Sequence, residues 1–148
     1  MRAKIVSAFP GTGKTTFFRD SGMLVLDSDS SDFSWKSPNV RNPDFPLNYI
    51  DHISKWQMNA DFILVSSHIE VRTALREAKL EYCVVYPKIG LKQEYLDRFT
   101  KRGSPDHFVE MMNNNWDKFI IGMKEDRTPY HIELVSGEFL NKGLTNYF

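Results

Sequence analysis

The chain has little of what disulfide-stabilised and membrane-embedded proteins depend on. Its 148 residues include one cysteine, so no disulfide framework can form within it. The cytoplasm is therefore the expected compartment, or the host cytoplasm if a phage encodes the chain. No apolar run approaches the ~20 residues of a membrane-spanning helix, and the first residues lack the apolar core of a signal peptide. We expect no membrane partner.

The chain also has no excess of charge of either sign. Nineteen lysine and arginine residues balance nineteen acidic residues, which gives a formal net charge of zero. Neutrality argues against a broad contact with a nucleic-acid backbone, although a local basic patch is compatible with it. With 41% hydrophobic residues and no repeat or linker, the sequence predicts a single globular domain over residues 1–148, as a monomer or homodimer.

The strongest chemical signal is the stretch AFPGTGKTT at residues 8–16, which fits the phosphate-binding loop pattern [G/A]-x-x-x-x-G-K-[S/T]. Gly11 and Gly13 allow a tight turn in which successive N–H groups point at phosphate oxygens. Lys14 is expected to reach the β- and γ-phosphates, and Thr15 is expected to place its hydroxyl on Mg²⁺. An apolar run precedes the loop and a helical segment follows it, so we predict a nucleoside triphosphate site here.

Five short apolar runs alternate with helical patterns, which predicts parallel strands joined by crossover helices. The expected strands cover residues 3–7, 23–26, 62–65, 82–86 and 132–135. Helices are expected from about residue 14, over 46–58, 69–78 and 91–101, after a break at 103–105, and near 138–141, whereas 33–48 should be mostly loop. Right-handed crossovers then favour a three-layer α/β domain with a five-stranded parallel sheet in the order 2-3-1-4-5.

An acidic cluster, DSDSSD at residues 27–32, follows the second expected strand. Ligands of open α/β sheets bind at the carboxyl ends of the strands, so Asp27 and Asp29 are candidates for the metal and for an acceptor hydroxyl, respectively. A turn capped by Asp and Ser is the alternative. The third expected strand ends in VSSH without an acid, which leaves Thr15 and Asp27 as the predicted metal residues.

Three further residues are candidates for substrate binding, each with a plainer alternative. His68 follows the third expected strand and is interpreted as a polar residue at the rim of a pocket. Arg72 lies four residues further on the same helical face, where it could bind an anionic substrate or be a solvated surface residue. Arg41, with Asn39 and Asn42, could contact the acceptor, but the polarity of a loop explains these residues equally well.

A pair of arginines precedes the break Gly103-Ser104-Pro105. Arg98 and Arg102 are four residues apart, so both guanidinium groups lie on one helix face. On a mobile lid they would neutralise charge on a transferring phosphoryl group. A basic helix end that favours the helix dipole is the alternative.

The phosphate loop, the Asp-x-Asp after the second strand and the Arg-x-x-x-Arg before a Gly break together resemble the small P-loop kinases. This group includes nucleoside monophosphate kinases, shikimate and gluconate kinases and the kinase domain of polynucleotide kinase. The layout over nearly the whole chain, including residues 66–72 and 134–140, looks most like the small phage-type nucleotide kinases. The resemblance implies a P-loop kinase fold, an acceptor-binding region at 33–60 and a lid at about 98–107.

The resemblance also implies ATP and Mg²⁺ as cofactors, with ATP bound by Gly11, Thr12, Gly13, Lys14, Thr15 and Thr16. The expected function is Mg²⁺-dependent phosphoryl transfer from ATP to a small acceptor, a nucleoside or deoxynucleoside monophosphate. The catalytic candidates are Lys14, Asp27, Asp29, Arg98 and Arg102, and the substrate-binding candidates are Asp29, Arg41, His68 and Arg72. Two alternatives stay open: a kinase acting on a nucleic-acid end or a modified base in DNA, and a non-catalytic ATP-binding switch.

Overall fold

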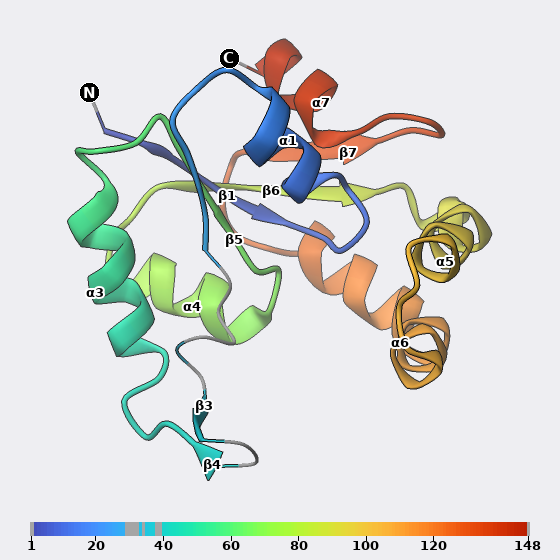
Figure 1. The fold of residues 1–148 in the computed structure, drawn as a ribbon, viewed down its shortest axis with the longest axis horizontal. Coiled ribbons are helices and arrows are strands. Elements are labelled where there is room, and N and C mark those ends of the chain that lie inside the picture. Colours follow the sequence, from blue (N-terminus) through green and yellow to red (C-terminus); the bar gives the residue numbers. More distant parts are fainter. Residues whose placement is uncertain (1, 29–32, 34, 38–39, 148) are drawn as a thin grey trace.

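Five parallel strands form the central sheet of the protein. The computed structural model describes residues 2–28, 33, 35–37 and 40–147 (Figure 1). The strands are β1 (Lys4–Ala8), β2 (Val25–Asp27), β5 (Phe62–Val65), β6 (Tyr82–Pro87) and β7 (His131–Leu134). They lie in the order β2-β5-β1-β6-β7, and every neighbouring pair is parallel. The predicted α/β class with a five-stranded parallel sheet is confirmed.

Two short strands were not predicted from the sequence. β3 (Trp35–Ser37) and β4 (Val40–Arg41) form a separate antiparallel pair inside the segment that was expected to be mostly loop. With every strand numbered along the chain, the observed order is β2-β5-β1-β6-β7 instead of the expected 2-3-1-4-5. The numbers differ because β3 and β4 come between the second and third strands of the central sheet. The neighbours of β1 are β5 and β6, which contain the apolar runs at 62–65 and 82–86.

Helices cover both faces of the sheet (Figure 1). One face carries α1 (Lys14–Asp20) and α7 (Leu140–Tyr147). The other carries α3 (Leu47–Trp56), α4 (Ile69–Glu77), α5 (Lys92–Lys101) and α6 (Asp106–Lys124), with a 3₁₀ turn η1 (Ile89–Leu91) before α5. None of the helices in the described part of the chain has the length and apolar character needed to cross a membrane.

The last helix begins later than the sequence predicted, at residue 140 rather than near 138. The N–H of Glu138 donates to the carbonyl of Val135, and the Glu138 carboxylate accepts the N–H of Val135 (2.8 Å). Gly137 has a φ of 77°, which closes this segment as a turn instead of a helical start. The turn places residues 136–140 beside the loop that follows β1, where Leu140 donates to the carbonyl of Thr12.

The apolar residues of the strands alternate between two buried clusters, because successive side chains of a strand point to opposite faces. Both faces of the sheet are covered, which explains why the strands appear in the sequence as uninterrupted apolar runs. Cys83 is buried, and its burial raises the pKa of the thiol to about 12, so the thiol stays protonated at neutral pH. Ile5, Ile63 and Val84 belong to the cluster under α3–α6, and Val6, Leu64 and Val85 belong to the cluster under α1 and α7.

Candidate phosphate-binding site

The loop between β1 and α1 has several of its carbonyl groups bound by the protein. The carbonyl of Phe9 accepts a hydrogen bond from the buried hydroxyl of Thr12 (2.7 Å). The carbonyl of Gly11 accepts one from Nη1 of Arg98 on α5 (2.9 Å). The carbonyl of Thr12 accepts the N–H of Leu140, which begins α7 (2.8 Å). The loop's own Thr12, α5 and the start of α7 therefore hold the carbonyl side of the loop in place.

The N–H groups of the same loop differ from its carbonyl groups in their hydrogen bonding. Among the described residues, the N–H groups of Gly11, Thr12 and Gly13 have no hydrogen-bond acceptor. Gly11 and Gly13 have φ values of 82° and 93°, as the motif requires. A Cβ on Gly11 would come within 2.9 Å of Phe99, and one on Gly13 within 3.2 Å of Phe139, so packing also demands glycine. Successive N–H groups without acceptors form a cradle for an anion.

A cation and two hydroxyls follow the cradle directly. α1 begins at Lys14, and its first hydrogen bond joins the N–H of Phe17 to the carbonyl of Gly13 (2.9 Å). Lys14 is half-buried, whereas Thr15 and Thr16 are exposed in the first turn. The predicted ATP-binding residues 11–16 thus form one continuous segment at the carboxyl end of β1.

The acidic cluster begins at the same edge of the sheet, two strands away from the loop. Asp27 ends β2, pairs in register with Leu64 of β5, and is exposed. β5 separates β2 from β1, so Asp27 lies across the end of β5 from the loop. Asp29 lies outside the described residues, and its predicted place beside an acceptor stays a prediction.

Two serine hydroxyls lie at the carboxyl end of β5, where the sequence shows no acid. Ser66 follows β5, and its carbonyl accepts the hydroxyl of Ser7, the residue before the loop motif (2.8 Å). The N–H of Ser28 donates to the carbonyl of Leu64 (2.9 Å), which places Ser28 at the same edge. The buried hydroxyls of Ser28 and Ser66 have no partner among the described residues. An unsatisfied buried polar group costs roughly 1–3 kcal/mol, so both suit a bound water or the water shell of a cation.

Arg98 is brought to the phosphate loop from a distance of 87 positions in the chain. Besides the Gly11 carbonyl, its guanidinium binds the carboxylate of Glu94 (2.9 Å). The same group lies 4.3 Å from the ring centre of Tyr95 and 4.1 Å from that of Phe139. The i,i+4 spacing of Glu94 and Arg98 was the available sequence signal, and the sequence interpretation missed Glu94.

Arg102 lies one turn beyond Arg98, at the end of α5. Its guanidinium is 5.0 Å from the ring centre of Phe99, and its Nε donates to the hydroxyl of Ser104 (3.0 Å). No carboxylate within the described ranges forms an ion pair with Arg102. Gly103 follows with a φ of 84°, so the break between α5 and α6 lies where the sequence predicts it.

Arg41 links the β3–β4 hairpin to the first turn of α4. It forms an ion pair with Glu70 (3.3 Å), and its guanidinium lies 5.2 Å from the ring centre of Trp35 and 5.5 Å from that of Phe45. His68 precedes α4 and is exposed. The hairpin therefore contacts the start of α4, the helix that follows β5.

The two asparagines near Arg41 do not add to this arrangement. Asn39 lies outside the described residues. The side-chain oxygen of Asn42 accepts the N–H of Asp44 (2.9 Å), which is a local turn contact.

Arg72 is not a surface residue, and that alternative for it is wrong. It is 5% exposed, and its Nη1 lies 2.7 Å from Oδ2 of Asp126. Its Nε donates to the carbonyl of Ser67 (2.9 Å). The hydroxyl of Tyr82 donates to the other carboxylate oxygen of Asp126 (2.7 Å). Asp126 follows α6, far from Arg72 in the sequence, and its carboxylate holds the Arg72 guanidinium inside the protein. The contacts of Arg72 therefore give no support to its predicted role in substrate binding.

Removing Arg72 should destabilise the protein strongly. Arg72→Ala leaves Asp126 buried without its main cation, and breaking a buried pair in this way costs about 3–5 kcal/mol. Urea denaturation gives the change in the free energy of unfolding. Arg76→Ala is the matched control, because Arg76 is 39% exposed and 4.0 Å from the same carboxylate, so its loss should cost less than about 1 kcal/mol. Equal losses in the two variants would contradict the assigned role of Arg72.

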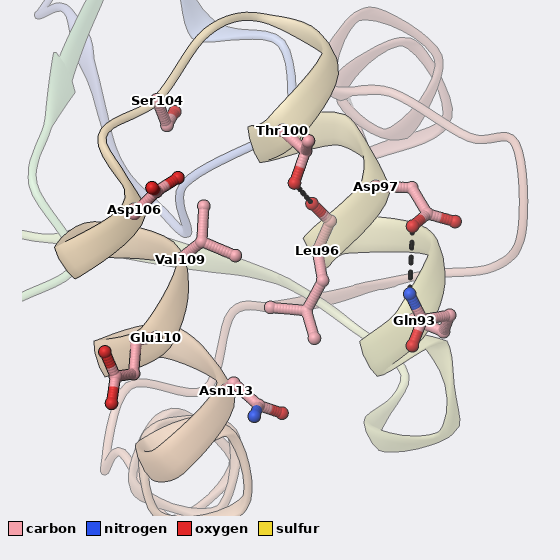
Figure 2. A pocket seen from close by; sticks show the side chains of 9 residues that line it. All are labelled: Gln93, Leu96, Asp97, Thr100, Ser104, Asp106, Val109, Glu110 and Asn113. Carbon is pink, nitrogen blue, oxygen red and sulfur yellow. Dashed lines mark hydrogen bonds between the residues drawn. The ribbon is translucent and has the colours of Figure 1, made fainter.

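A separate hollow of about 430 Å³ lies between α5 and α6 (Figure 2). Its lining includes the carboxylates of Asp97, Asp106 and Glu110 and no cationic side chain. It lies on another face of α5 than Arg98, since residues 93, 96, 97 and 100 line it. Three carboxylates without a cation do not suit phosphate, so the loop after β1 is the better candidate for an anion site.

Comparisons with known proteins assign no family to the chain. No family model matches it, and no curated protein matches it. A crystal structure of an uncharacterized protein from Eubacterium ventriosum ATCC 27560 is similar, with a TM-score of 0.48 and 13% sequence identity over 99% of this chain and 96% of that chain. A similarity at this level carries no argument about fold or function.

Proposed function

We propose that this protein is a kinase of the P-loop type that transfers the γ-phosphoryl group of ATP to a small acceptor, a nucleoside or deoxynucleoside monophosphate. One observation carries the proposal. Several carbonyl groups of the loop after β1 are bound by the protein, whereas the N–H groups of Gly11, Thr12 and Gly13 have no acceptor among the described residues. Lys14 follows directly. A loop of this kind suits the phosphates of a nucleotide.

In this proposal the loop and Lys14 bind the phosphates, with Lys14 at the β- and γ-groups. Mg²⁺ would be held by the Thr15 hydroxyl and, from across the end of β5, by Asp27; when bound, it neutralises phosphate charge. The hydroxyls of Ser28 and Ser66, which have no partner among the described residues, fit this assignment because they can hydrogen-bond the waters that Mg²⁺ usually retains. They offer a neutral alternative to an acid at the end of β5.

The transfer itself breaks one bond and forms one. An oxygen of the acceptor forms a bond to the γ-phosphorus as the bond to the β–γ bridging oxygen breaks, and ADP leaves with that electron pair. A monophosphate oxygen is already ionised at neutral pH, since its second pKa is about 6. A hydroxyl acceptor would instead give its proton to a base, and Asp29 is the proposed base. Arg98 and Arg102 are proposed to neutralise charge on the phosphoryl group from a lid at about 98–107.

The acceptor is proposed to bind in the 33–60 region. The exposed ring of Trp35 and the guanidinium of Arg41 lie together on the β3–β4 hairpin. The ion pair of Arg41 with Glu70 connects this hairpin to α4, next to His68. Arg41 and His68 therefore remain the proposed acceptor residues, and Arg72, whose charge is used inside the protein, does not.

A panel of acceptors tests the proposed function. ADP release from Mg²⁺-ATP is measured with each ribo- and deoxynucleoside monophosphate, with a 5′-hydroxyl oligonucleotide, and with no acceptor. We expect release that depends on at least one monophosphate and that is lost without Mg²⁺. Release with the oligonucleotide alone would replace the proposed acceptor by a nucleic-acid end. Tight ATP binding without acceptor-dependent release would overturn the kinase in favour of an ATP-binding switch.

A further inference from the structure

Glu94, in the first turn of α5, joins two segments that are far apart in the sequence. Its Oε1 accepts a hydrogen bond from the hydroxyl of Ser136. Its Oε2 accepts the N–H of Gly137 (3.1 Å) and Nη2 of Arg98 (2.9 Å). The hydrogen bonds from Ser136 and Gly137 lower the pKa of Glu94, so the carboxylate is ionised at neutral pH. One carboxylate thus ties α5 to the turn that follows β7.

Both of the tied segments contact the phosphate loop. From α5, Arg98 donates to the carbonyl of Gly11. From the turn, the Phe139 ring lies against Gly13 and also under the guanidinium of Arg98, 4.1 Å from it. The Arg98 side chain is 17% exposed. Glu94 on the same helix and Gly11 in the loop accept two of its five N–H donors.

We propose that Glu94 is a positioning residue for phosphoryl transfer, which holds the Arg98 guanidinium against the phosphate loop with its remaining N–H groups available to phosphate oxygens. The inference rests on the proposed kinase function and adds a residue that the loop motif does not contain. The physical reason is the length of the arginine side chain. Without the carboxylate, the guanidinium keeps its ring contacts but gains rotamer freedom, and a charge displaced by about 1 Å can cost on the order of 100-fold in rate.

The test compares turnover with nucleotide affinity. Glu94→Gln keeps the size of the side chain and removes its charge. We expect kcat to fall by about 10- to 100-fold. The dissociation constant for Mg²⁺-ATP, measured by calorimetry on the same preparation, should change far less. Asp97→Asn is the matched control: it removes an acidic charge from the same helix, where Asp97 is exposed and contacts Gln93 instead of an arginine. This variant should behave as wild type.

A double-mutant cycle shows whether Glu94 acts through Arg98. If it does, Glu94→Gln should cause no further loss of kcat in an Arg98→Ala background, because the group that it positions is already absent. A purely structural role for Glu94 would give losses that add, and this outcome would overturn the proposal. Equal losses in Glu94→Gln and Asp97→Asn would overturn it too, since any acidic charge on α5 would then do the same.

The failure of this inference can be told apart from the failure of the proposed function. A wild-type chain that binds no ATP, or that transfers no phosphoryl group to any acceptor in the panel, overturns both. A wild-type chain that turns over normally while Glu94→Gln keeps the same kcat overturns the role of Glu94 alone. Thermal unfolding of every variant, followed by circular dichroism, confirms that the comparison is made between folded proteins.

Discussion

Lys14→Ala should abolish nucleotide turnover while the fold survives. Lys14 is the first residue of α1, next to the cradle of N–H groups, and it is half-buried at the protein surface rather than in either apolar cluster. Electrostatic stabilisation supplies most of the catalysis in phosphoryl transfer, and the loss of one well-placed donor costs about 100- to 1,000-fold. The measurement is kcat/KM for ATP by ADP release, together with ATP affinity by calorimetry.

Lys118→Ala provides the control for this experiment, because Lys118 is an exposed lysine on α6. It removes the same charge from a part of the surface away from the loop and should leave turnover unchanged. Circular dichroism should show that both variants are folded. If a folded Lys14→Ala variant kept wild-type kinetics, the nucleotide assignment of the loop would be wrong.

Arg102→Ala should lower kcat by about 100-fold or more, since arginines that contact a transferring phosphoryl group supply about 10³- to 10⁵-fold in other enzymes. Arg102 is the stronger lid candidate because no described carboxylate pairs with it, whereas Arg98 is paired with Glu94. Its charge is thus available to a substrate. The break at Gly103 allows the end of α5 to change direction. Arg102→Lys should recover little of the loss, since lysine lacks the planar fork of donors.

Lys101→Ala is the matched control, as Lys101 is the preceding residue of the same helix and is exposed. It should change kcat little. Steady-state kinetics at saturating ATP, with the best acceptor from the panel, measure both variants. Equal small effects of the two substitutions would show that Arg102 is only a basic residue at a helix end.

The tight turn after β1 could be predicted because its information is local. Glycines at two positions, a lysine and a threonine lie within eight residues, and the structure places positive φ values at Gly11 and Gly13. The strands could be predicted for a related reason: a strand buried on both faces is an uninterrupted apolar run, whatever its partners are. The break between α5 and α6 likewise follows from Gly103 and Pro105 alone.

The β3–β4 hairpin and the start of α7 could not be predicted in this way. β3 has three residues and β4 has two, and all of them are exposed. No alternation of apolar and polar residues therefore indicates these strands in the sequence. The residues around Glu138 have helical character, but the bond of its carboxylate to the N–H of Val135 makes a turn there instead. In both segments, contacts of single side chains decide between conformations that differ little in local propensity.

By itself, the sequence determined the strands of the sheet, the glycine turn after β1 and the arginine pair at the end of α5, because spacing along the chain is enough to specify each of them. Only the tertiary structure decided how each arginine side chain is used. It paired Arg72 with Asp126 inside the protein and Arg98 with Glu94 beside the loop, and it left Arg102 without a carboxylate among the described residues. The reason is physical: an ion pair depends on which segments the packing brings within 4 Å, and the partners Arg72 and Asp126 are 54 positions apart in the chain.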